Sequence, residues 1–361
     1  MIRYSRQIQL KDFGTKKQEM LLSAKVLVVG AGGLGVPVLQ YLTSMGTGTI
    51  GIVENDTVSL TNLQRQVIYT EAQAQNKDFK LEAAVKRLQQ LNSQVHFKTF
   101  PTFLNHENAL AILQDFDLVI DCSDNFATRY LINDACVMLK KPFIYGALHG
   151  FEGHVSVFNY KNGPTYRCLF PVEPDAKQIP DCNTNGVLGV IPGIIGNLQA
   201  LEAVKLLTGI GSVLSGELLI YDGLAQQIRK IRIPKSPENL KITALKPITI
   251  HSNCESSNYN INAQELKKLI TKNPGIQLVD VRTKAEYDVF ALKPSINIPL
   301  DQLPQRFNDL KTNQPVYVLC ESGIRSNKAI SLLKDWNTNL EVYHLEGGLK
   351  KYRELTVLHS S

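Results

Sequence analysis

One short stretch near the N-terminus restricts the fold more than any other part of the chain. Residues 25–30 read KVLVVG, a valine-rich apolar run that is typical of a buried parallel strand. The glycine-rich segment GAGGLG, a helical pattern from Val36 to Met45 and a second apolar run from Thr49 to Glu54 follow. A strand, a helix and a strand in this order predict an α/β fold that opens a doubly wound, mainly parallel sheet.

The rest of the sequence predicts two domains. Strand and helix patterns continue to residue 233, and residues 234–261 then form a linker rich in Pro, Ser and Asn with no convincing period. Asn262, with Glu265 three residues later, is expected to cap the first helix of a smaller α/β unit over residues 262–358. Other expected elements are helices at 80–91, 105–113, 193–207 and 326–334 and strands at 95–100, 118–122, 142–158, 217–233, 278–282, 316–320 and 340–344.

Composition excludes several classes of protein. The net charge of +6 is mild for 361 residues, and no dense basic stretch carries interleaved aromatic residues, so no nucleic acid is expected as a partner. The longest apolar stretch, residues 187–200, is shorter than the ~20 residues of a membrane span, and the first residues do not resemble a secretory signal. Six widely spaced cysteines do not form a disulfide framework, so we expect a cytoplasmic protein.

Glycines after the first expected strand have the spacing G-x-G-x-x-G, at Gly30, Gly32 and Gly35. Glycine lets the backbone turn tightly and approach phosphate groups, and the following helix N-terminus supplies free N–H groups and the positive end of a dipole. Glu54 stands at the end of the second strand, where an acidic side chain can bind a ribose. Taken alone, this pattern predicts a nucleotide site, and its usual ligand is a nicotinamide dinucleotide.

The residues that follow favour a triphosphate instead. The polar stretch after the second expected strand contains Asp56, Asn62 and Arg65, and Lys80 lies a little further on. Asp124 follows another expected strand, at the edge where open parallel sheets bind ligands. Arginine and lysine suit phosphate groups and a carboxylate suits Mg²⁺, so the set predicts a site for ATP and Mg²⁺ with Asp124 as the metal ligand.

Residues 1 to about 233 resemble the adenylyltransferases of molybdopterin and thiazole biosynthesis, the bacterial relatives of ubiquitin-activating enzymes. The resemblance rests on five motifs in order: RYSRQ at 3–7, GAGGLG at 30–35, DTVSLTNLQRQ at 56–66, DCSDN at 121–125 and YRCLFP at 166–171. Such an ordered set is far more specific than the glycines alone. It implies a homodimer with one ATP site per subunit, which adenylates the C-terminal glycine of a ubiquitin-like sulfur carrier ending in Gly-Gly.

The same resemblance implies roles for single residues. Glu54 would hold the ribose, and Asp124 would organise Mg²⁺ and the attacking carboxylate. Arg6 would reach the triphosphate of the neighbouring subunit. The residues expected to surround the nucleotide and its phosphates are Gly30, Gly32, Gly33, Gly35, Asp56, Asn62, Arg65 and Lys80.

Residues 262–358 resemble a rhodanese domain. The matching motifs are VDVR at 279–282 with Glu286 nearby, INIPL at 296–300, the C-x-x-x-x-R loop from Cys320 to Arg325, and LEGG at 345–348. A thiol between a strand and a helix gains thiolate character from the helix dipole, and Arg325 adds to it. Cys320 would then carry the sulfur as a persulfide. Glu321 stands where a basic residue is common, and ALKPS at 291–295 replaces the usual lead-in, so both could slow transfer or alter the sulfur donor.

Two further cysteine positions follow from the resemblance. Cys182 lies in a polar loop where the family often places a cysteine that links to the carrier during sulfur transfer. Many relatives also hold zinc with two C-x-x-C pairs, but here Thr165 replaces the first cysteine. Cys168, His251 and Cys254 would supply at most three ligands, so we expect no structural zinc. Cys122 and Cys136 are expected to be buried, small apolar residues.

These observations predict an enzyme that activates the carrier in its first domain and supplies sulfur from the second. A cysteine desulfurase is a possible sulfur donor, and molybdopterin, thiamine and tRNA thiolation are possible pathways. Two alternatives remain at this point. A dehydrogenase with an appended domain has no need of Arg65, Lys80 and Asp124, whereas a degenerate activator would hold the carrier without adenylating it.

Overall fold

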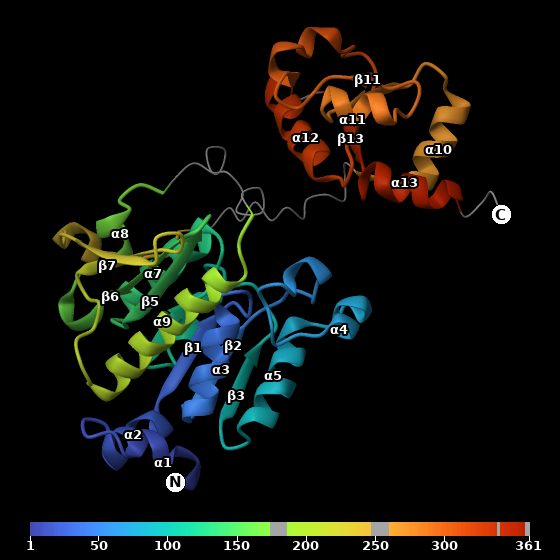
Figure 1. The fold of residues 1–361 in the computed structure, drawn as a ribbon. Coiled ribbons are helices and arrows are strands. Elements are labelled where there is room, and N and C mark those ends of the chain that lie inside the picture. Colours follow the sequence, from blue (N-terminus) through green and yellow to red (C-terminus); the bar gives the residue numbers. More distant parts are fainter. Residues whose placement is uncertain (174–185, 247–259, 338–339, 358–361) are drawn as a thin grey trace. The chain divides into compact units, whose positions relative to one another are not determined.

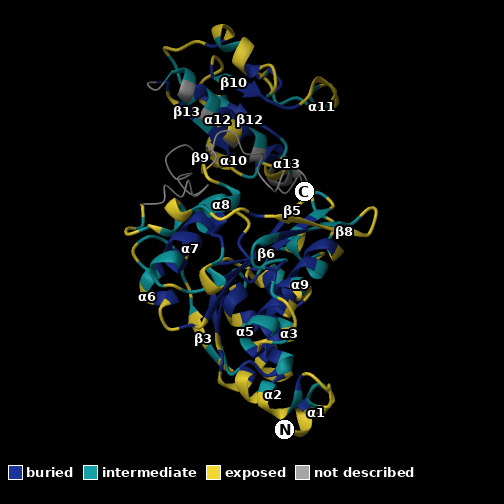
Figure 2. Cartoon of the chain, turned by 90° about the vertical axis from the view of Figure 1, so that its left-hand side faces the viewer, coloured by how far each residue is buried: buried dark blue, intermediate teal, exposed yellow. Residues whose placement is uncertain are grey.

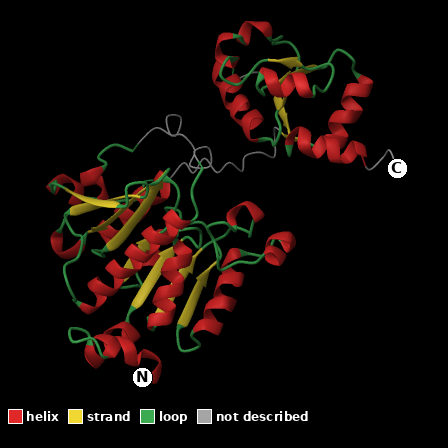
Figure 3. Cartoon of the chain, in the orientation of Figure 1, coloured by secondary structure: helices red, strands yellow, loops and turns green. Residues whose placement is uncertain are grey.

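The computed structural model describes residues 1–173, 186–246, 260–337 and 340–357. The chain divides into two compact units, Met1–Ile250 and His251–Ser361, and each is described by itself (Figure 1). Cys182, His251 and Cys254 lie outside the described residues. Helices and strands alternate through both units, as the sequence predicts for an α/β protein (Figure 3).

The first unit is built on one eight-stranded sheet with the order β3-β2-β1-β4-β5-β6-β7-β8. Its five strands from β3 to β5 are parallel, and β6, β7 and β8 join them as antiparallel neighbours. This confirms the predicted doubly wound, mainly parallel sheet. The strands are β1 (Lys25–Val29), β2 (Thr49–Val53), β3 (His96–Phe100), β4 (Leu118–Asp121), β5 (Phe143–His149), β6 (Glu152–Phe158), β7 (Glu217–Asp222) and β8 (Gln227–Arg232).

Both faces of this sheet are covered, because alternate side chains of a strand point to opposite faces and here both sets are apolar. Val26 and Val28 of β1 belong to one core, and Leu27 and Val29 belong to the other. Figure 2 shows the central strands as the buried interior of the unit, whereas β8 is exposed along its whole length. The first core includes residues of α3, α5 and α9, and the second includes residues of α6, α7 and α8.

The longest helices of the first unit are α3, α5, α7 and α9, and the others have ten residues or fewer. The helices are α1 (Ser5–Ile8), α2 (Gly14–Ser23), α3 (Gly35–Met45), α4 (Glu71–Asn76), α5 (Lys80–Leu91), α6 (Ala109–Leu113), α7 (Phe126–Met138), α8 (Tyr166–Leu169) and α9 (Val190–Thr208), with 3₁₀ turns η1 (Ile2–Tyr4), η2 (Leu60–Asn62), η3 (Tyr160–Asn162) and η4 (Pro237–Leu240).

α9 is long and apolar enough to cross a membrane by length and composition. Half of its apolar window is buried, and it packs against α3, β5 and β6. Core helices of globular domains pass the same test. Among the described residues no other helix meets it.

The second unit is built on a five-stranded parallel sheet with the order β11-β10-β12-β13-β9. Asn262 caps α10 in a capping box with Glu265, as predicted. The elements are β9 (Asn260–Ile261), α10 (Ala263–Lys272), β10 (Gln277–Asp280), α11 (Lys284–Val289), β11 (Ile296–Asn297), η5 (Leu303–Gln305), η6 (Phe307–Asp309), β12 (Val316–Leu319), α12 (Ile324–Trp336), β13 (Val342–Leu345) and α13 (Gly348–Val357).

Candidate functional site

The topology of the first sheet brings two loops together at one edge. β1 lies between β2 and β4, so the chain leaves β1 toward one side of the sheet and returns to β4 on the other. Open α/β sheets bind ligands at such a point, outside the carboxyl ends of the strands. The glycine-rich loop follows β1 and residues 122–125 follow β4. Both predicted nucleotide segments therefore lie at this edge.

Backbone contacts require two of the glycines in the loop. Gly30 has a φ of +98°, and a Cβ there would lie 2.8 Å from the carbonyl oxygen of Cys122. A Cβ at Gly35 would lie 2.0 Å from the carbonyl oxygen of Gly30, closer than two such atoms can approach. The loop thus stays tight against β4, and the N-terminus of α3 faces the edge, where its dipole favours an anion.

The outer part of the loop meets the polar segment that follows β2. A Cβ at Gly33 would lie 3.4 Å from Cδ of Arg65, and one at Gly32 would lie 3.5 Å from Nε2 of Gln66. Nη2 of Arg65 donates to Oδ1 of Asn62 at 2.7 Å, which holds the guanidinium near the glycines. Oε1 of Gln66 is buried and has no partner among the described residues, so an acceptor is available beside the loop.

Glu54 is buried at the end of β2 and supports the loop. Its Oε2 accepts from the backbone N–H of Ala31 at 2.9 Å, and its Oε1 accepts from those of Asn55 and Asp56 at 2.8 and 2.9 Å. Both carboxylate oxygens already have backbone donors, so a ribose hydroxyl would have to share them. The ribose role of Glu54 stays a prediction.

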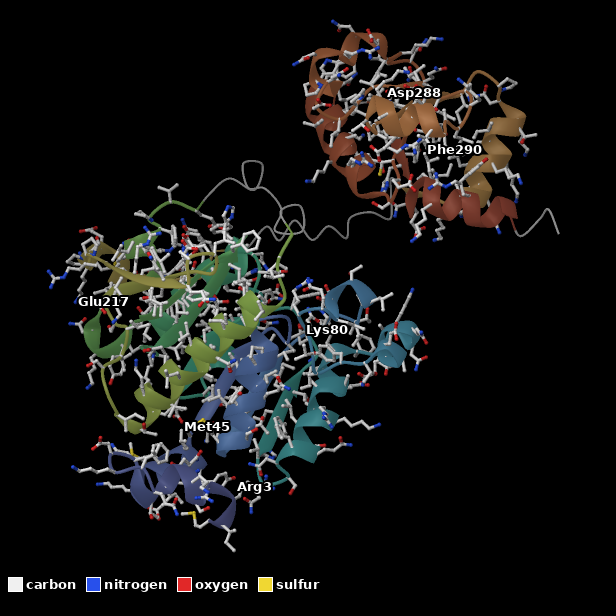
Figure 4. All side chains as sticks on the ribbon, viewed as in Figure 1. Arg3, Met45, Lys80, Glu217, Asp288 and Phe290 are labelled. Carbon is white, nitrogen blue, oxygen red and sulfur yellow. The ribbon has the colours of Figure 1, made fainter. Side chains whose placement is uncertain are left out.

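Lys80 is a buried cation at the start of α5 (Figure 4). Its Nζ donates to Oδ2 of Asp56 at 3.0 Å, and the two side chains are 6% and 55% exposed. A buried ammonium needs a partner, because leaving water is costly for a charge. Asp56 is solvated enough to be displaced, so a phosphate group could replace it on Lys80.

The end of β4 presents carboxylates to the same edge. Oδ1 of Asp121 accepts from Oγ of Ser123 at 2.6 Å, and burial raises the pKa of Asp121 above its ordinary value. Asp124 is exposed just before α7, and Asn125 caps that helix by accepting from the backbone N–H of Thr128 at 2.9 Å. An exposed carboxylate beside the glycine-rich loop fits a hydrated Mg²⁺, which keeps several waters and takes one or two carboxylates.

Arg6 lies at the other end of the unit. It is exposed on α1, next to η1, where Nη1 of Arg3 donates to the carbonyl of Leu91 at 3.1 Å. Leu91 and Lys80 are opposite ends of α5, a helix of 12 residues and so about 18 Å long. Figure 4 labels Arg3 and Lys80, which lie toward opposite ends of α5. Arg6 therefore does not join its own chain's site.

The second unit places Cys320 directly after β12, where its thiol is buried. The backbone N–H of Gly323 donates to Sγ at 3.1 Å, and Oγ of Ser326 lies 3.3 Å from Sγ. Gly323 has a φ of +91°, which turns the chain into α12. A Cβ at Gly348 would lie 2.4 Å from the carbonyl oxygen of Glu321, so this glycine lets the LEGG turn pack on the cysteine loop.

Arg325 makes a two-bond ion pair rather than a bond to the thiol. Its Nη1 and Nη2 donate to the carboxylate of Glu286 at 2.7 and 2.6 Å. This bonding lowers the pKa of Glu286 to about 2. The bonds to Glu286 also raise the pKa of Arg325. The predicted support of Arg325 for a Cys320 thiolate stays a prediction.

Glu321 is tied down by two arginines. Nη1 of Arg282 donates to Oε2 of Glu321 at 3.2 Å, and Arg353 donates to Oε1. Arg282 also pairs with the buried carboxylate of Asp280 at 2.8 Å. The acid that departs from the rhodanese pattern thus faces positive charge and does not stand alone beside the thiol.

Cys168 is surrounded by hydrogen-bond donors of the protein, and the other ligands considered for zinc, His251 and Cys254, lie outside the described residues. Around Sγ of Cys168 lie the hydroxyl and N–H of Thr165 at 3.4 Å, the N–H of Ser236 at 3.3 Å and Nδ2 of Asn239 at 3.8 Å. Burial opposes ionisation, but these hydrogen bonds together lower the pKa of Cys168. Structural zinc takes nitrogen and sulfur ligands, and the described neighbours of Cys168 are hydroxyl, backbone and amide groups, so the absence of zinc stays a prediction. No cluster of three metal-binding side chains occurs in the described part of the chain.

The other described cysteines are structural, as predicted. Cys122 and Cys136 are buried, and burial raises the pKa of both thiols.

Two residues that support the first candidate site were not predicted from the sequence. Tyr69 donates to the carbonyl of Ala31 at 2.8 Å, and Gln199 donates to that of Asp121 at 2.7 Å. Neither residue belongs to a sequence motif, because each contacts a residue that is far away along the chain.

Comparison with known proteins gives the family. The ThiF family model matches residues 4–242, and the rhodanese-like domain model matches residues 262–355. Adenylyltransferase and sulfurtransferase MOCS3 of Drosophila virilis is 38% identical over 373 residues, which cover 96% of this chain and 82% of that protein. The proteins of the same name from Aedes aegypti and Dictyostelium discoideum are 39% and 35% identical, covering 91% and 98% of this chain and 80% and 94% of theirs.

Solved structures share the fold of the first unit. Escherichia coli MccB with ATP has a TM-score of 0.57 at 22% identity, covering 65% of this chain and 72% of that chain. PaaA has a TM-score of 0.56 at 24% identity, covering 65% and 74%. Since the family models and the relatives extend along both units, the chain belongs to the ThiF family and carries a C-terminal rhodanese-like domain, in the arrangement of the proteins named adenylyltransferase and sulfurtransferase MOCS3.

Proposed function

We propose that this chain adenylates the C-terminal glycine of a ubiquitin-like sulfur carrier and then delivers sulfur to it from a persulfide on Cys320. The names of its relatives, which join adenylyltransferase to sulfurtransferase, support both steps. The carrier's carboxylate attacks the α-phosphate of ATP and pyrophosphate leaves, so the protein mainly orients the reactants and neutralises charge. No general base is needed, because the carboxylate is already ionised near neutral pH.

The observation that carries the adenylation step is the convergence at the sheet edge. The glycine-rich loop, Arg65, Lys80 and Asp124 come from four separate segments: Arg65 approaches the loop at Gly33, Lys80 pairs with Asp56 just after β2, and Asp124 follows β4. Phosphates would take the loop N–H groups, Arg65 and Lys80, and Asp124 would hold Mg²⁺ and orient the carboxylate. When bound, Mg²⁺ supplies neutralisation of the triphosphate charge.

The sulfur step is assigned to the second unit. The buried Cys320 thiol with a backbone donor on its sulfur suits a persulfide, because such a loop of N–H groups stabilises an anion. The terminal sulfur of that persulfide would attack the activated carbonyl of the carrier and AMP would leave, which gives an acyl disulfide. A second thiol would then attack Sγ of Cys320, the S–S bond would break, and the carrier's thiocarboxylate would leave. The new disulfide on Cys320 would be reduced by a further thiol. Cys182, outside the described residues, remains the proposed thiol that links to the carrier. A cysteine desulfurase is a proposed sulfur donor.

A homodimer is also part of the proposal. Arg6 lies far from its own chain's glycine-rich loop, so it could act on a triphosphate only if a second subunit brings it there. We assign residues 1–233 to the adenylyltransferase domain, 234–261 to the linker and 262–358 to the sulfurtransferase domain. A cytoplasmic location suits free thiols on a persulfide pathway.

The test of adenylation is carrier-dependent exchange of pyrophosphate into ATP. The assay compares wild type, Asp124→Ala and the control Asp115→Ala, which removes an exposed carboxylate paired with Lys98 instead. We expect exchange that requires a carrier ending in Gly-Gly, is lost in Asp124→Ala and survives in Asp115→Ala. Absence of exchange with every such carrier, in a protein that still binds ATP and the carrier, would favour a binding module.

A further inference from the structure

Behind the cysteine loop lies a buried histidine that the proposed reaction does not use. His344 is on β13, is 6% exposed, and points its Nδ1 at Oγ of Ser326, 3.4 Å away. The same hydroxyl lies 3.3 Å from Sγ of Cys320. Thiol, hydroxyl and imidazole therefore form one continuous chain of polar contacts from the sulfur into the core of the unit.

The sheet explains how these residues meet. β13 pairs with β12 in parallel, with His344 opposite Val318, so the imidazole is on the face that also carries Val318. Val318 packs in the core formed with Ala329 and Ile330 of α12. Ser326 lies in the first turn of α12, just above that core. The histidine is thus held under the N-terminus of the helix that follows the cysteine loop.

The second ring nitrogen of His344, Nε2, lies in a buried position with no hydrogen-bond partner among the described residues. The same holds for Oδ1 of Asn260. Asn260 is the register partner of His344 on β9, so both side chains are on one face of adjacent strands. A buried polar atom without a partner is costly, and an N–H on Nε2 directed at Oδ1 would satisfy both atoms. This tautomer leaves Nδ1 free to accept a proton.

We propose that Ser326 and His344 form a proton relay for Cys320. The thiol proton of Cys320 passes to Oγ of Ser326 while the hydroxyl proton of Ser326 passes to Nδ1 of His344. A neutral thiol and a neutral imidazole thereby become a thiolate and an imidazolium. His344 acts through Ser326 and is a positioning residue, not one that touches the sulfur.

The relay rests on the proposed sulfur step and supplies its nucleophile. The Cys320 thiolate attacks the terminal sulfur of a persulfide donor, R–S–SH. A bond forms between Sγ and that sulfur, the S–S bond of the donor breaks, and its electron pair leaves with R–S⁻. No net oxidation occurs, and the proton held on His344 can pass to R–S⁻ or to the solvent.

Charges around the relay favour a transient transfer. Burial lowers the pKa of His344, so the ring is neutral at pH 7 and can accept a proton, while the nearby Glu346 and the backbone of Leu345 oppose this shift. On the sulfur side Arg325 is paired with Glu286, Asp280 with Arg282, and Glu321 with Arg282 and Arg353. An imidazolium in this interior is stable only beside the thiolate that forms with it.

One competing contact is built into the chain. Oγ of Ser326 also donates to the carbonyl of Gly323 at 3.0 Å. While the hydroxyl faces that carbonyl, it can accept from the thiol but cannot donate to Nδ1. Proton transfer to His344 therefore requires the hydroxyl to rotate from the carbonyl of Gly323 to the imidazole.

The test is the pH profile of Cys320 alkylation by iodoacetamide in the full-length protein, read at the Cys320 peptide by mass spectrometry. The variants are Ser326→Ala, His344→Asn and the double variant, with Tyr343→Phe as control, a neighbouring β13 residue whose ring stacks on Tyr317. We expect each single variant to react roughly tenfold more slowly at pH 7, as for a shift of one pH unit in the profile. The control should follow the wild type.

The double variant separates a relay from general damage. Two members of one chain act as a unit, so the double variant should be no slower than the slower single variant. The relay would be overturned if the rate reductions of the two single variants multiply in the double variant. It would also be overturned if each single variant is alkylated at a rate within twofold of wild type. Alkylation needs neither ATP nor carrier, so its result stands even if the exchange assay fails. Conversely, normal pyrophosphate exchange would not support the relay if the alkylation profile contradicts it.

Discussion

Ion pairs decide how single residues behave in both candidate sites. Lys80 and Asp56 pair across 3.0 Å with only the lysine buried, and Arg325 is held by two bonds to Glu286. Motif residues such as these can be predicted from the sequence, because their types and spacing are read within a short segment. Their partners are harder to predict. No spacing rule connects Cys320 with His344, because the pairing of β12 with β13 in the sheet brings them together.

Replacing the buried lysine tests the phosphate role. Lys80→Met should weaken ATP binding at least tenfold, since a hydrogen bond to a charged group contributes about 1.5–3 kcal/mol. The fold should survive, because the partner carboxylate of Asp56 is 55% exposed and can be solvated by water. Lys86→Met, an exposed change on the same helix, should bind ATP as the wild type does. Isothermal titration with ATP measures both, and equal affinities would exclude Lys80 from the site.

The Glu286 ion pair should give the second unit an acid-dependent stability. The pKa of Glu286 is lowered to about 2 by its bonds to Arg325, from about 4.5 when unfolded. A carboxylate with a lowered pKa stabilises the fold fully above its unfolded pKa, and this contribution is lost as pH falls toward 2. Glu286→Gln should therefore be less stable than wild type at pH 6, with a gap that narrows between pH 4.5 and 3.

The single tryptophan makes this measurement specific. Trp336 lies in α12 of the second unit and stacks on Phe307, with 4.9 Å between the ring centroids. Its fluorescence during urea unfolding therefore reports on that unit and not on the first. A stability gap that is constant from pH 6 to pH 3 would contradict the assigned pKa shift of Glu286.

At the scale of elements, the order of strands and helices could be predicted, and some ends could not. The helix expected at 105–113 begins only at Ala109, because Oδ1 of Asn105 accepts from the N–H groups of Glu107 and Asn108 and holds them in a turn. α7 was not predicted, and neither were the short strands β9 and β11. Two-residue strands carry no readable period, and α7 is apolar or buried nearly all round, which hides a helical stripe.

The glycine-rich loop should tolerate no side chain at its last glycine. Gly35→Ala places a Cβ 2.0 Å from the carbonyl of Gly30, and overpacking of this kind costs about 1–3 kcal/mol. Gly193→Ala in α9 meets no atom within 4 Å and should stabilise the helix by about 0.5–1 kcal/mol. Calorimetry of both variants is expected to give melting shifts of opposite sign, and a neutral Gly35→Ala would contradict the contact.

At the scale of the whole molecule, the two candidate sites belong to separate compact units. Each site follows parallel strands at their carboxyl ends, so each cluster of reactive groups is supported by its own sheet and core. From the composition shift after residue 233, the sequence predicts a linker at residues 234–261.

Because the two candidate sites lie in separate units, a substitution in one should abolish one activity and leave the other intact. Cys320→Ala should leave carrier-dependent pyrophosphate exchange within about twofold of wild type and abolish thiocarboxylate formation, because the thiol takes no part in charge neutralisation at the phosphates. Asp124→Ala should lose pyrophosphate exchange and still accept a persulfide sulfur on Cys320. Exchange assays and mass spectrometry of the carrier and of the Cys320 peptide test both variants. Loss of exchange in Cys320→Ala would show that the two sites depend on each other.

The hydrogen-bonded thiol at Cys168 changes what can damage this part of the protein. Thr165 and Ser236 connect α8 to the segment after β8 through that sulfur. A thiol with a lowered pKa is more readily attacked by peroxide, however, and a sulfinic acid no longer fits among the same donors. An oxidant that reaches Cys168 would therefore weaken the connection between α8 and the segment after β8.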